Sequence, residues 1–365
     1  MLILPVGTLY NVSVTGICCA VPDNPKQTED YIETFGVDCV EKFIKMTGVN
    51  HRYISKPTQT SSDLCYVSAE ALFSKFGWDK STVDALIFVS QTPDYRLPAT
   101  ACVLHERLGL EKDCIAFDVN LGCSGYVYGL QIAGSLLQSE NIKRVLLLCG
   151  DTISSYLSPV DKSSTMLFGD AGSATMLERT EEQHMHFMLK TNGKGYNSII
   201  VPSGACRRIS GDYERKEKGE GIFRNDFELA MDGTEVFNFT ISEVPKTVNE
   251  FLYSNKESVD SYDWYVLHQA NLFMLNHIAK KAKIPKEKLP ITIDRFGNTS
   301  VASIPLTIVD LYNNNNGIPA VNNRQKDHIM LVGFGVGLSW GIIGLDIDPQ
   351  ICLPVIYTND YYSEE

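Results

Sequence analysis

The stretch from residue 115 to residue 137 constrains the fold more than any other part of the chain. It opens with a short apolar run typical of a β-strand at Ile115–Val119, breaks at Asn120 and Gly122, and continues with helical periodicity. Small residues recur four apart in the helical part and form a smooth ridge for close packing: Gly125, Gly129 and Ala133. The remaining positions are apolar nearly all round, which predicts a helix buried in a large core.

Cys123 lies between this predicted strand and helix. A helix N-terminus lowers the pKa of a thiol, because its unpaired N–H groups favour the thiolate. A strand–turn–helix corner also lifts a side chain clear of the sheet, as in a serine nucleophile elbow. Cys123 is therefore a candidate nucleophile. A small buried core thiol is the alternative, and this stretch alone leaves both open.

Composition and charge limit the classes of function. The 365 residues allow one large or two ordinary domains, and a net charge of −12 argues against non-specific binding to nucleic acid or to a membrane surface. The first residues, Met1–Val6, lack the basic and apolar segments of a signal peptide, and no apolar run reaches transmembrane length. The ten cysteines form no C-x-x-C pair, so we expect no metal site and reduced thiols in a cytoplasmic protein.

An internal repeat sets the predicted architecture. Three apolar strand runs, Ala85–Ser90, Ile115–Val119 and Arg144–Cys149, alternate with helical stretches at about 99–108 and 123–138. The second half repeats the scheme with strands at 263–267, 291–294 and 328–332, helices at 271–283 and about 300–312, and a hairpin partner at 342–347. This predicts an α/β protein made of two pseudo-symmetric halves, 1–180 and 181–365.

Reactive residue types follow equivalent strands of the two halves. The corners are Ser90-Gln91, Gly122-Cys123 and Gly150-Asp151 in the first half, and His268-Gln269, Gly297-Asn298 and Gly333-Phe334 in the second. Ligands in such sheets bind at the carboxyl ends of strands. A lone histidine or asparagine at a strand end is usually structural, but together Cys123, His268 and Asn298 are expected to meet in one pocket.

Two polar segments are less informative. Residues 203–228 are rich in glycine and charge, and a solvated mobile loop is the favoured interpretation. The alternative is a lid whose basic residues meet an anionic ligand, namely Arg207, Arg208, Arg215 and Lys216. The tract Asn313–Asn316 before Gly317 is interpreted as a helix end and turn.

Several segments, in order along the chain, resemble the thiolase-fold condensing enzymes, specifically the chain-initiating β-ketoacyl-ACP synthase III type. The matching segments are Asp118-Val-Asn-Leu-Gly-Cys-Ser-Gly-Tyr, Leu167-Phe-Gly-Asp-Ala-Gly-Ser-Ala, Met231-Asp-Gly-Thr-Glu-Val-Phe, His268-Gln-Ala-Asn, Gly297-Asn-Thr-Ser-Val-Ala-Ser-Ile-Pro and Gly333-Phe-Gly-Val-Gly-Leu-Ser-Trp-Gly. They run in family order across nearly the whole chain. They are specific for the family and much less so for the substrate.

The resemblance implies a five-layer α-β-α-β-α fold, a homodimer, and acyl-CoA or acyl carrier protein as substrates, with no permanently bound cofactor. Cys123 would attack an acyl thioester, with the backbone N–H groups of Cys123 and Val336 stabilising the oxyanion. His268 and Asn298 would donate hydrogen bonds to a malonyl-type thioester while it loses carbon dioxide. The resulting carbanion would attack the acyl-Cys.

Some positions depart from the family pattern and leave the donor and the carrier open. Lys42 stands where a tryptophan usually stacks on adenine, Phe273 replaces an arginine that docks the carrier protein, and Asn238 replaces a lysine. The residue that lines the partner's acyl pocket, often phenylalanine, is Leu97. A basic patch for the carrier protein is expected at Lys280, Lys281 and Lys283, although a solvated helix face explains these lysines equally well.

Three functional readings follow, in order of preference. The first is a decarboxylating condensing enzyme of a specialised acyl-building pathway. The second keeps the acyl-Cys but passes the acyl group to an oxygen or nitrogen acceptor. The third is a non-catalytic partner subunit, which the intact Cys123 argues against. A cysteine peptidase also uses Cys, His and Asn, but the duplicated strand ends and the Gly333–Gly337 segment fit a condensing enzyme better.

Overall fold

The computed structural model describes residues 6–219, 221–314 and 325–363. The first-half prediction is confirmed: strands β4 (Ala85–Val89), β5 (Ile115–Val119) and β6 (Arg144–Asp151) are parallel, with β4 in the middle. Helices α4 (Thr100–Leu108) and α5 (Gly125–Leu136) connect them, and α3 (Ser61–Phe76) precedes them. Residues 1–5 and part of the Asn313–Asn316 tract lie outside the described residues.

In the second half, one predicted strand is wrong. Strands β12 (Trp264–Leu267), β13 (Asp327–Gly335) and β14 (Ser339–Ile347) form, with helices α7 (Leu272–Ala282) and α9 (Ser303–Asn313) between β12 and β13. The segment 291–294 is instead the approach to a short helix, α8 (Ile293–Phe296). The Gln269 side chain accepts hydrogen bonds from the Thr292 and Ile293 backbone amides, at 3.0 and 3.3 Å. These amides are therefore not available to a neighbouring strand.

Two long strands join the halves. Strand β1 (Val6–Pro22) runs antiparallel to β7 (Ala171–Thr191) along most of its length. The first part of β7 pairs with β6, and its last part pairs with β14. One strand therefore belongs to both halves, and residue 180 lies inside it. The division at 180/181 stays a prediction.

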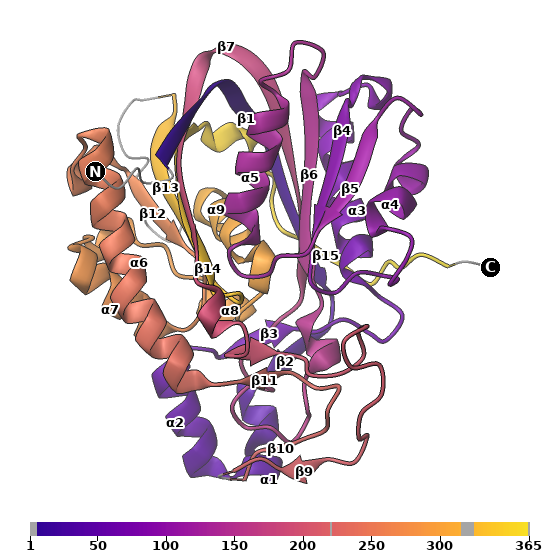
Figure 1. Ribbon diagram of the computed structural model, residues 1–365, viewed down its shortest axis with the longest axis vertical. Coiled ribbons are helices and arrows are strands. Elements are labelled where there is room, and N and C mark those ends of the chain that lie inside the picture. The colour runs from indigo at the N-terminus through magenta and orange to yellow at the C-terminus, as the bar shows by residue number, and fades with distance from the viewer. Residues whose placement is uncertain (1–5, 220, 315–324, 364–365) are drawn as a thin grey trace.

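The elements form the expected five layers (Figure 1). The central core packs α5 and α9 between strands of both halves. Helices α3 and α4 cover the outer face of the first half, and α6 (Gly233–Asn255) and α7 cover that of the second. Strand β4 shows why both faces are apolar: Ile87 and Val89 point to the central core while Leu86 and Phe88 face α3 and α4.

The small-residue ridge of α5 fits closely against the sheet. A Cβ atom at Gly129 would lie 2.9 Å from a Leu147 methyl carbon on β6, and one at Gly125 would lie 2.8 Å from Val89 on β4. This close packing is as predicted, and Val301 of the short helix Ser300–Ala302 also contacts the ridge at Gly125. Among the described residues, every cysteine is a free thiol, and none of the helices has the length and apolar character needed to cross a bilayer.

Candidate active site

Cys123 lies in the predicted strand–turn–helix corner. Strand β5 ends at Val119, and α5 begins at Gly125. The turn is tight, because the Gly125 amide donates to the Gly122 carbonyl at 2.6 Å and a Cβ at Gly122 would overlap the Gln91 side-chain oxygen. The corner places the buried Cys123 thiol at the wall of a cavity.

The second-half corners carry His268 and Asn298. The His268 amide continues the sheet by donating to Val332 O at 2.9 Å, and the ring Nδ1 lies 2.7 Å from the Ser303 hydroxyl. The Asn298 amide donates to Leu167 O at 2.9 Å. The Asn298 side-chain oxygen accepts from the Ser300 amide at 3.0 Å, which leaves its NH₂ group as the free donor.

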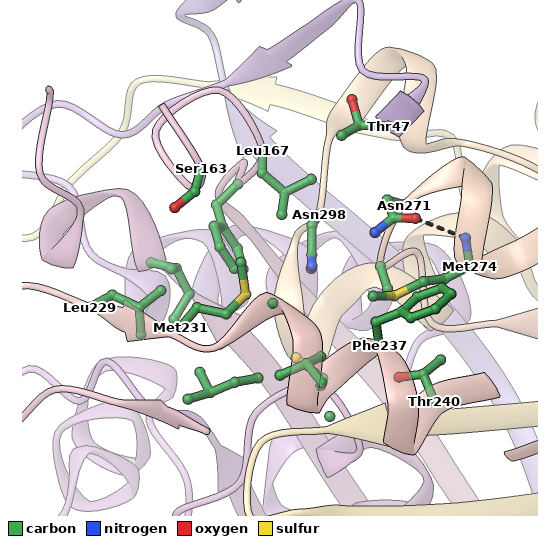
Figure 2. A pocket seen from close by; sticks show the side chains of 18 of the residues that line it. Thr47, Ser163, Leu167, Leu229, Met231, Phe237, Thr240, Asn271, Met274 and Asn298 are labelled. Carbon is green, nitrogen blue, oxygen red and sulfur yellow. Dashed lines mark hydrogen bonds between the residues drawn. The ribbon is translucent and has the colours of Figure 1, made fainter. Parts of the chain in front are cut away.

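The three side chains meet as expected. Cys123, His268 and Asn298 all line one cavity of about 620 Å³. Figure 2 shows Asn298 among the side chains that line it. Cys123 and His268 reach this space from the ends of strands β5 and β12, whereas Asn298 follows the short helix α8 and is held there by its backbone pairing with Leu167 and Phe168. Among the described residues, no three His, Cys, Asp or Glu side chains gather in a metal-binding arrangement.

The predicted lowering of the Cys123 pKa is wrong. Burial raises the pKa of the Cys123 thiol to about 11, and the negative charge of Asp151 contributes to the rise. Hydrogen bonds from the Ser300 hydroxyl and from the backbone amides of Val336 and Cys123 limit it. The thiol is therefore protonated at neutral pH, and its proton must leave when the sulfur reacts.

His268 is uncharged at physiological pH. Burial lowers its pKa to about 3, and a hydrogen bond with the Ser300 backbone only partly opposes this. A neutral imidazole offers one N–H donor and no positive charge. The site therefore presents hydrogen-bond donors, rather than a cation, to a bound carbonyl.

The glycine-rich turn after β13 packs directly on the nucleophile. A Cβ atom at Gly335 would lie 2.6 Å from Cys123 Cβ and 2.9 Å from its sulfur. We expect Gly335→Ala to slow acylation of Cys123 about 100-fold, because a shift of about 1 Å in a reacting group costs that much. Intact-protein mass spectrometry of the acyl adduct over time measures this rate. Gly193→Ala is the control, because a Cβ there meets nothing within 4 Å, and an equal loss in both variants contradicts the prediction.

Known proteins resemble this chain along nearly all of its length. Residues 117–193 match the family model for 3-oxoacyl-[acyl-carrier-protein (ACP)] synthase III, and residues 252–347 match that of its C-terminal part. A β-ketoacyl-[acyl-carrier-protein] synthase III of Clostridium perfringens is 30% identical over 346 residues, covering 91% of this chain and 98% of that protein. One from Prochlorococcus marinus is 32% identical over 340 residues, covering 90% and 95%. The chain belongs to the 3-oxoacyl-ACP synthase III family.

The fold agrees with this assignment. The crystal structure of a 3-oxoacyl-(acyl-carrier protein) synthase from Burkholderia xenovorans LB400 superposes with a TM-score of 0.87 at 38% identity, covering 97% of this chain and 99% of that one. Membership of this synthase III family makes the chain a condensing enzyme of the transferase class.

The walls of the synthase III cavity are mostly apolar. Helices α2 (Val37–Thr47), α6 and α7 and the loops between them supply aliphatic and aromatic side chains: Phe43, Met46, Ile153, Leu167, Ile199, Ile222, Leu229, Met231, Val236, Phe237, Phe273 and Met274 (Figure 2). Sequence reasoning missed most of them. In the sequence, these residues are distinguished only by being apolar, and the segments that contain them have the pattern of ordinary core or loop.

The charged loop is neither wholly solvated nor a basic lid. Its apolar residue Ile222 lines the cavity, as does Leu229 directly after the loop. Of the basic residues assigned to a lid, Arg215 pairs with Glu228 at 2.6 Å and Lys216 with Asp212 at 2.5 Å. Arg207 and Arg208 are exposed and do not line the cavity. The loop therefore contributes apolar wall rather than anion-binding charge.

The positions that depart from the family pattern lie around the cavity and on the surface. Lys42 and Phe273 line the cavity, and the Phe273 ring stacks on Phe237 with centroids 5.6 Å apart. Asn238 lies outside it, in a separate polar pocket, and Leu97 is 83% exposed. The exposed Lys280, Lys281 and Lys283 lie at the C-terminal end of α7, whereas Phe273 is near its N-terminus, about 10 Å away along the helix.

Proposed function

We propose that this protein primes Cys123 with an acyl thioester and then condenses that acyl group with a malonyl thioester by decarboxylative Claisen chemistry. The observation that supports this proposal is that the buried thiol of Cys123, the neutral imidazole of His268 and the oriented amide of Asn298 face one apolar cavity. An apolar cavity accepts an acyl chain and its pantetheine arm, and it excludes water that would hydrolyse the acyl-Cys.

The first half-reaction uses the sulfur and its backbone donors. Cys123 Sγ attacks the thioester carbonyl, and the carbonyl oxygen gains negative charge. The amides of Cys123 and Val336 lie close enough to the sulfur to lower the pKa of the thiol. We assign them to the oxyanion because a carbonyl oxygen carried on that sulfur would lie near both N–H groups. Collapse of the intermediate releases the donor thiol and leaves the acyl-Cys.

The second half-reaction uses His268 and Asn298. Their N–H groups stabilise the enolate that forms when the malonyl thioester loses carbon dioxide. A charged imidazolium is not needed, because the oriented donors lie in a water-poor site where each hydrogen bond is strong. The carbanion then attacks the acyl-Cys carbonyl, and Cys123 leaves as the thiolate.

We assign acyl-CoA and acyl carrier protein as the substrates, with no permanently bound cofactor, in a specialised acyl-building pathway of the cytoplasm. Family membership supports these substrates. The altered rim, where Lys42 and Phe273 stand at positions that usually bind adenine and the carrier protein, supports the specialised pathway. Lys280, Lys281 and Lys283 are the proposed carrier-protein patch.

A homodimer is also part of this proposal. Strand β5 is an edge strand with partly exposed side chains, and the exposed Leu97 follows the neighbouring strand β4. We propose that a second copy covers β5 and that Leu97 enters its acyl cavity. Light scattering is expected to give twice the chain mass of 40.6 kDa, and a monomer would contradict this part.

The proposed function is tested with wild-type protein, a panel of acyl-CoA donors, and malonyl thioesters on CoA and on carrier protein. The expected result is an acyl adduct on Cys123, carbon dioxide release that requires malonyl thioester, and a product two carbons longer than the donor acyl group. Transfer of the acyl group to an added alcohol or amine without carbon dioxide indicates the acyltransferase alternative. Absence of an adduct with every donor indicates a silent partner subunit.

A further inference from the structure

A buried carboxylate that lines no part of the cavity lies behind the nucleophile. Asp151 is the last residue of β6 and is fully buried. Its Oδ1 accepts hydrogen bonds from the Gln91 amide at 2.7 Å and the Ser90 hydroxyl at 3.0 Å. Its Oδ2 has no hydrogen-bond partner, although it is buried. Such a group is costly to bury, so a half-satisfied carboxylate beside a reactive site points to a use.

Ser300 lies between this carboxylate and the sulfur. Its hydroxyl is 4.0 Å from Cys123 Sγ. Burial raises the pKa of Asp151 to about 6, and the Ser300 hydroxyl is the largest of the hydrogen-bonding groups that limit the rise. The Ser300 hydroxyl therefore lies close to the Asp151 carboxyl group, and the short helix that begins at Ser300 packs against β6. One hydroxyl therefore neighbours both the Cys123 thiol and the Asp151 carboxyl group.

The backbone holds Ser300 in an uncommon conformation. Its φ of 49° is in the left-handed region, which non-glycine residues rarely occupy. The Ser300 amide is held by the Asn298 side-chain oxygen at 3.0 Å. Strained residues of this kind cluster at functional sites. Here the conformation places the hydroxyl between two titratable groups.

The remaining titratable groups around Asp151 stay neutral. They are Cys65 on α3, Cys149 on β6 and Tyr156 in the short helix after it. Burial raises the pKa of all three, so none is charged near pH 7. A thiolate at Cys123 and a carboxylate at Asp151 would repel each other, so at most one of the two groups is negatively charged at a time.

Within the proposed function, we propose that Asp151 stores the Cys123 proton while the sulfur carries the acyl group, and that Ser300 conducts that proton. On attack, the S–H bond breaks and the S–C bond to the acyl carbon forms. The thiol proton passes to Ser300 Oγ as the Ser300 hydroxyl proton passes to Asp151 Oδ2. The donor thiolate leaves and takes a proton from solvent.

The second half-reaction returns the stored proton. When the new C–C bond forms and the Cys123–acyl bond breaks, the released thiolate recovers its proton through Ser300, and Asp151 becomes a carboxylate again. One solvent proton is consumed per cycle, by the leaving donor thiol. Meanwhile Asp151 is neutral as the enolate forms, so no fixed negative charge behind the sulfur opposes it.

Proton uptake during acylation tests this inference. Wild-type protein is mixed at pH 7 with an acyl-CoA that labels Cys123, without malonyl thioester, in weak buffer with a pH indicator. The expected uptake is about one proton per acylated Cys123, because the donor thiol gains a solvent proton while Asp151 retains the thiol proton. Uptake near zero, with the adduct formed, overturns the inference while leaving the proposed function intact. Absence of the adduct in wild type is failure of the proposed function itself.

The pH dependence of the acylation rate in two variants distinguishes a proton store from a purely structural role. Asp151→Asn keeps the Oδ1 acceptor and removes the proton store, and Ser300→Ala removes the bridge. Each is expected to acylate about 100-fold more slowly at pH 7. The wild-type rate should level off above pH 6, whereas the variant rates should keep rising with pH.

Ser173→Ala is the matched control, because it removes a buried hydroxyl that bonds only to the Cys149 carbonyl at 2.8 Å. Its pH profile should match that of wild type. If folded Asp151→Asn protein has the wild-type pH profile of acylation, or if its acylation rate falls equally at every pH, the proton store is contradicted. If Asp151→Asn fails to fold, the pH profile of Ser300→Ala and the proton uptake of wild type still test whether Asp151 stores the proton.

Discussion

Replacing Cys123 with alanine is expected to abolish the stable acyl adduct and to lower product formation on the order of 10⁴-fold or more, because the covalent step loses its nucleophile. The Asn298 amide is not nucleophilic and does not take over the role. Intact-protein mass spectrometry after incubation with the acyl-CoA panel measures the adduct, and a coupled assay measures the product.

The two exposed cysteines are the controls for this prediction. Cys102 and Cys206 are exposed and can acylate non-specifically, whereas burial raises the pKa of thiols such as Cys65 and Cys149 and makes them inert. Cys206→Ala should keep the full adduct and activity. If Cys123→Ala retains the adduct while Cys206→Ala loses it, the nucleophile is assigned to the wrong thiol.

His268→Ala is expected to keep acylation of Cys123 within about threefold of wild type and to lower carbon dioxide release about 100- to 1,000-fold, the effect of removing one oxyanion donor. His268→Gln, which restores an N–H donor, should recover part of the loss. Single-turnover acylation and carbon dioxide release are measured separately. His277→Ala, on α7 and outside the cavity, is the matched histidine control.

The pH dependence separates the two roles that His268 can have. Its pKa of about 3 lies below its ordinary value, so the ring stays neutral as pH rises from 5 to 8. Decarboxylation should therefore show no His268 titration in that range. If His268→Ala instead blocks the first acylation, His268 is the base for the thiol, as in a cysteine peptidase, and the assigned division of roles is wrong.

The fold was largely predictable where residue spacing is local. The strand Ile115–Val119, the turn at Gly122 and the helix after it appear as expected, because apolar periodicity and glycine positions act within a few residues. The strand expected at 291–294 is wrong, because a side chain 22 to 25 residues earlier, Gln269, binds the amides that a strand would use. Spacing along the chain carries no sign of such a contact.

In the site, too, local sequence pattern predicts some features and contacts between distant residues decide the others. Cys123 and His268 were predictable as strand-end residues, whereas the strand expected before Asn298 does not form. Gly150-Asp151 was recognised only as one more corner. The role of Asp151 depends on its burial and on Ser300, which lies 149 residues away in the chain. The predicted fall in the Cys123 pKa failed for a related reason. The helix position suggests stabilisation of the thiolate, but burial and the Asp151 charge outweigh it.

By itself, the sequence determined most of the strands and helices, the duplicated α/β plan and the choice of candidate site residues, because these follow from local pattern and from motif matches along the chain. Only the tertiary structure decided the long β7 shared by both halves, the apolar walls of the cavity and the protonation states within it. Those depend on which distant side chains are brought together and how completely water is removed from around them.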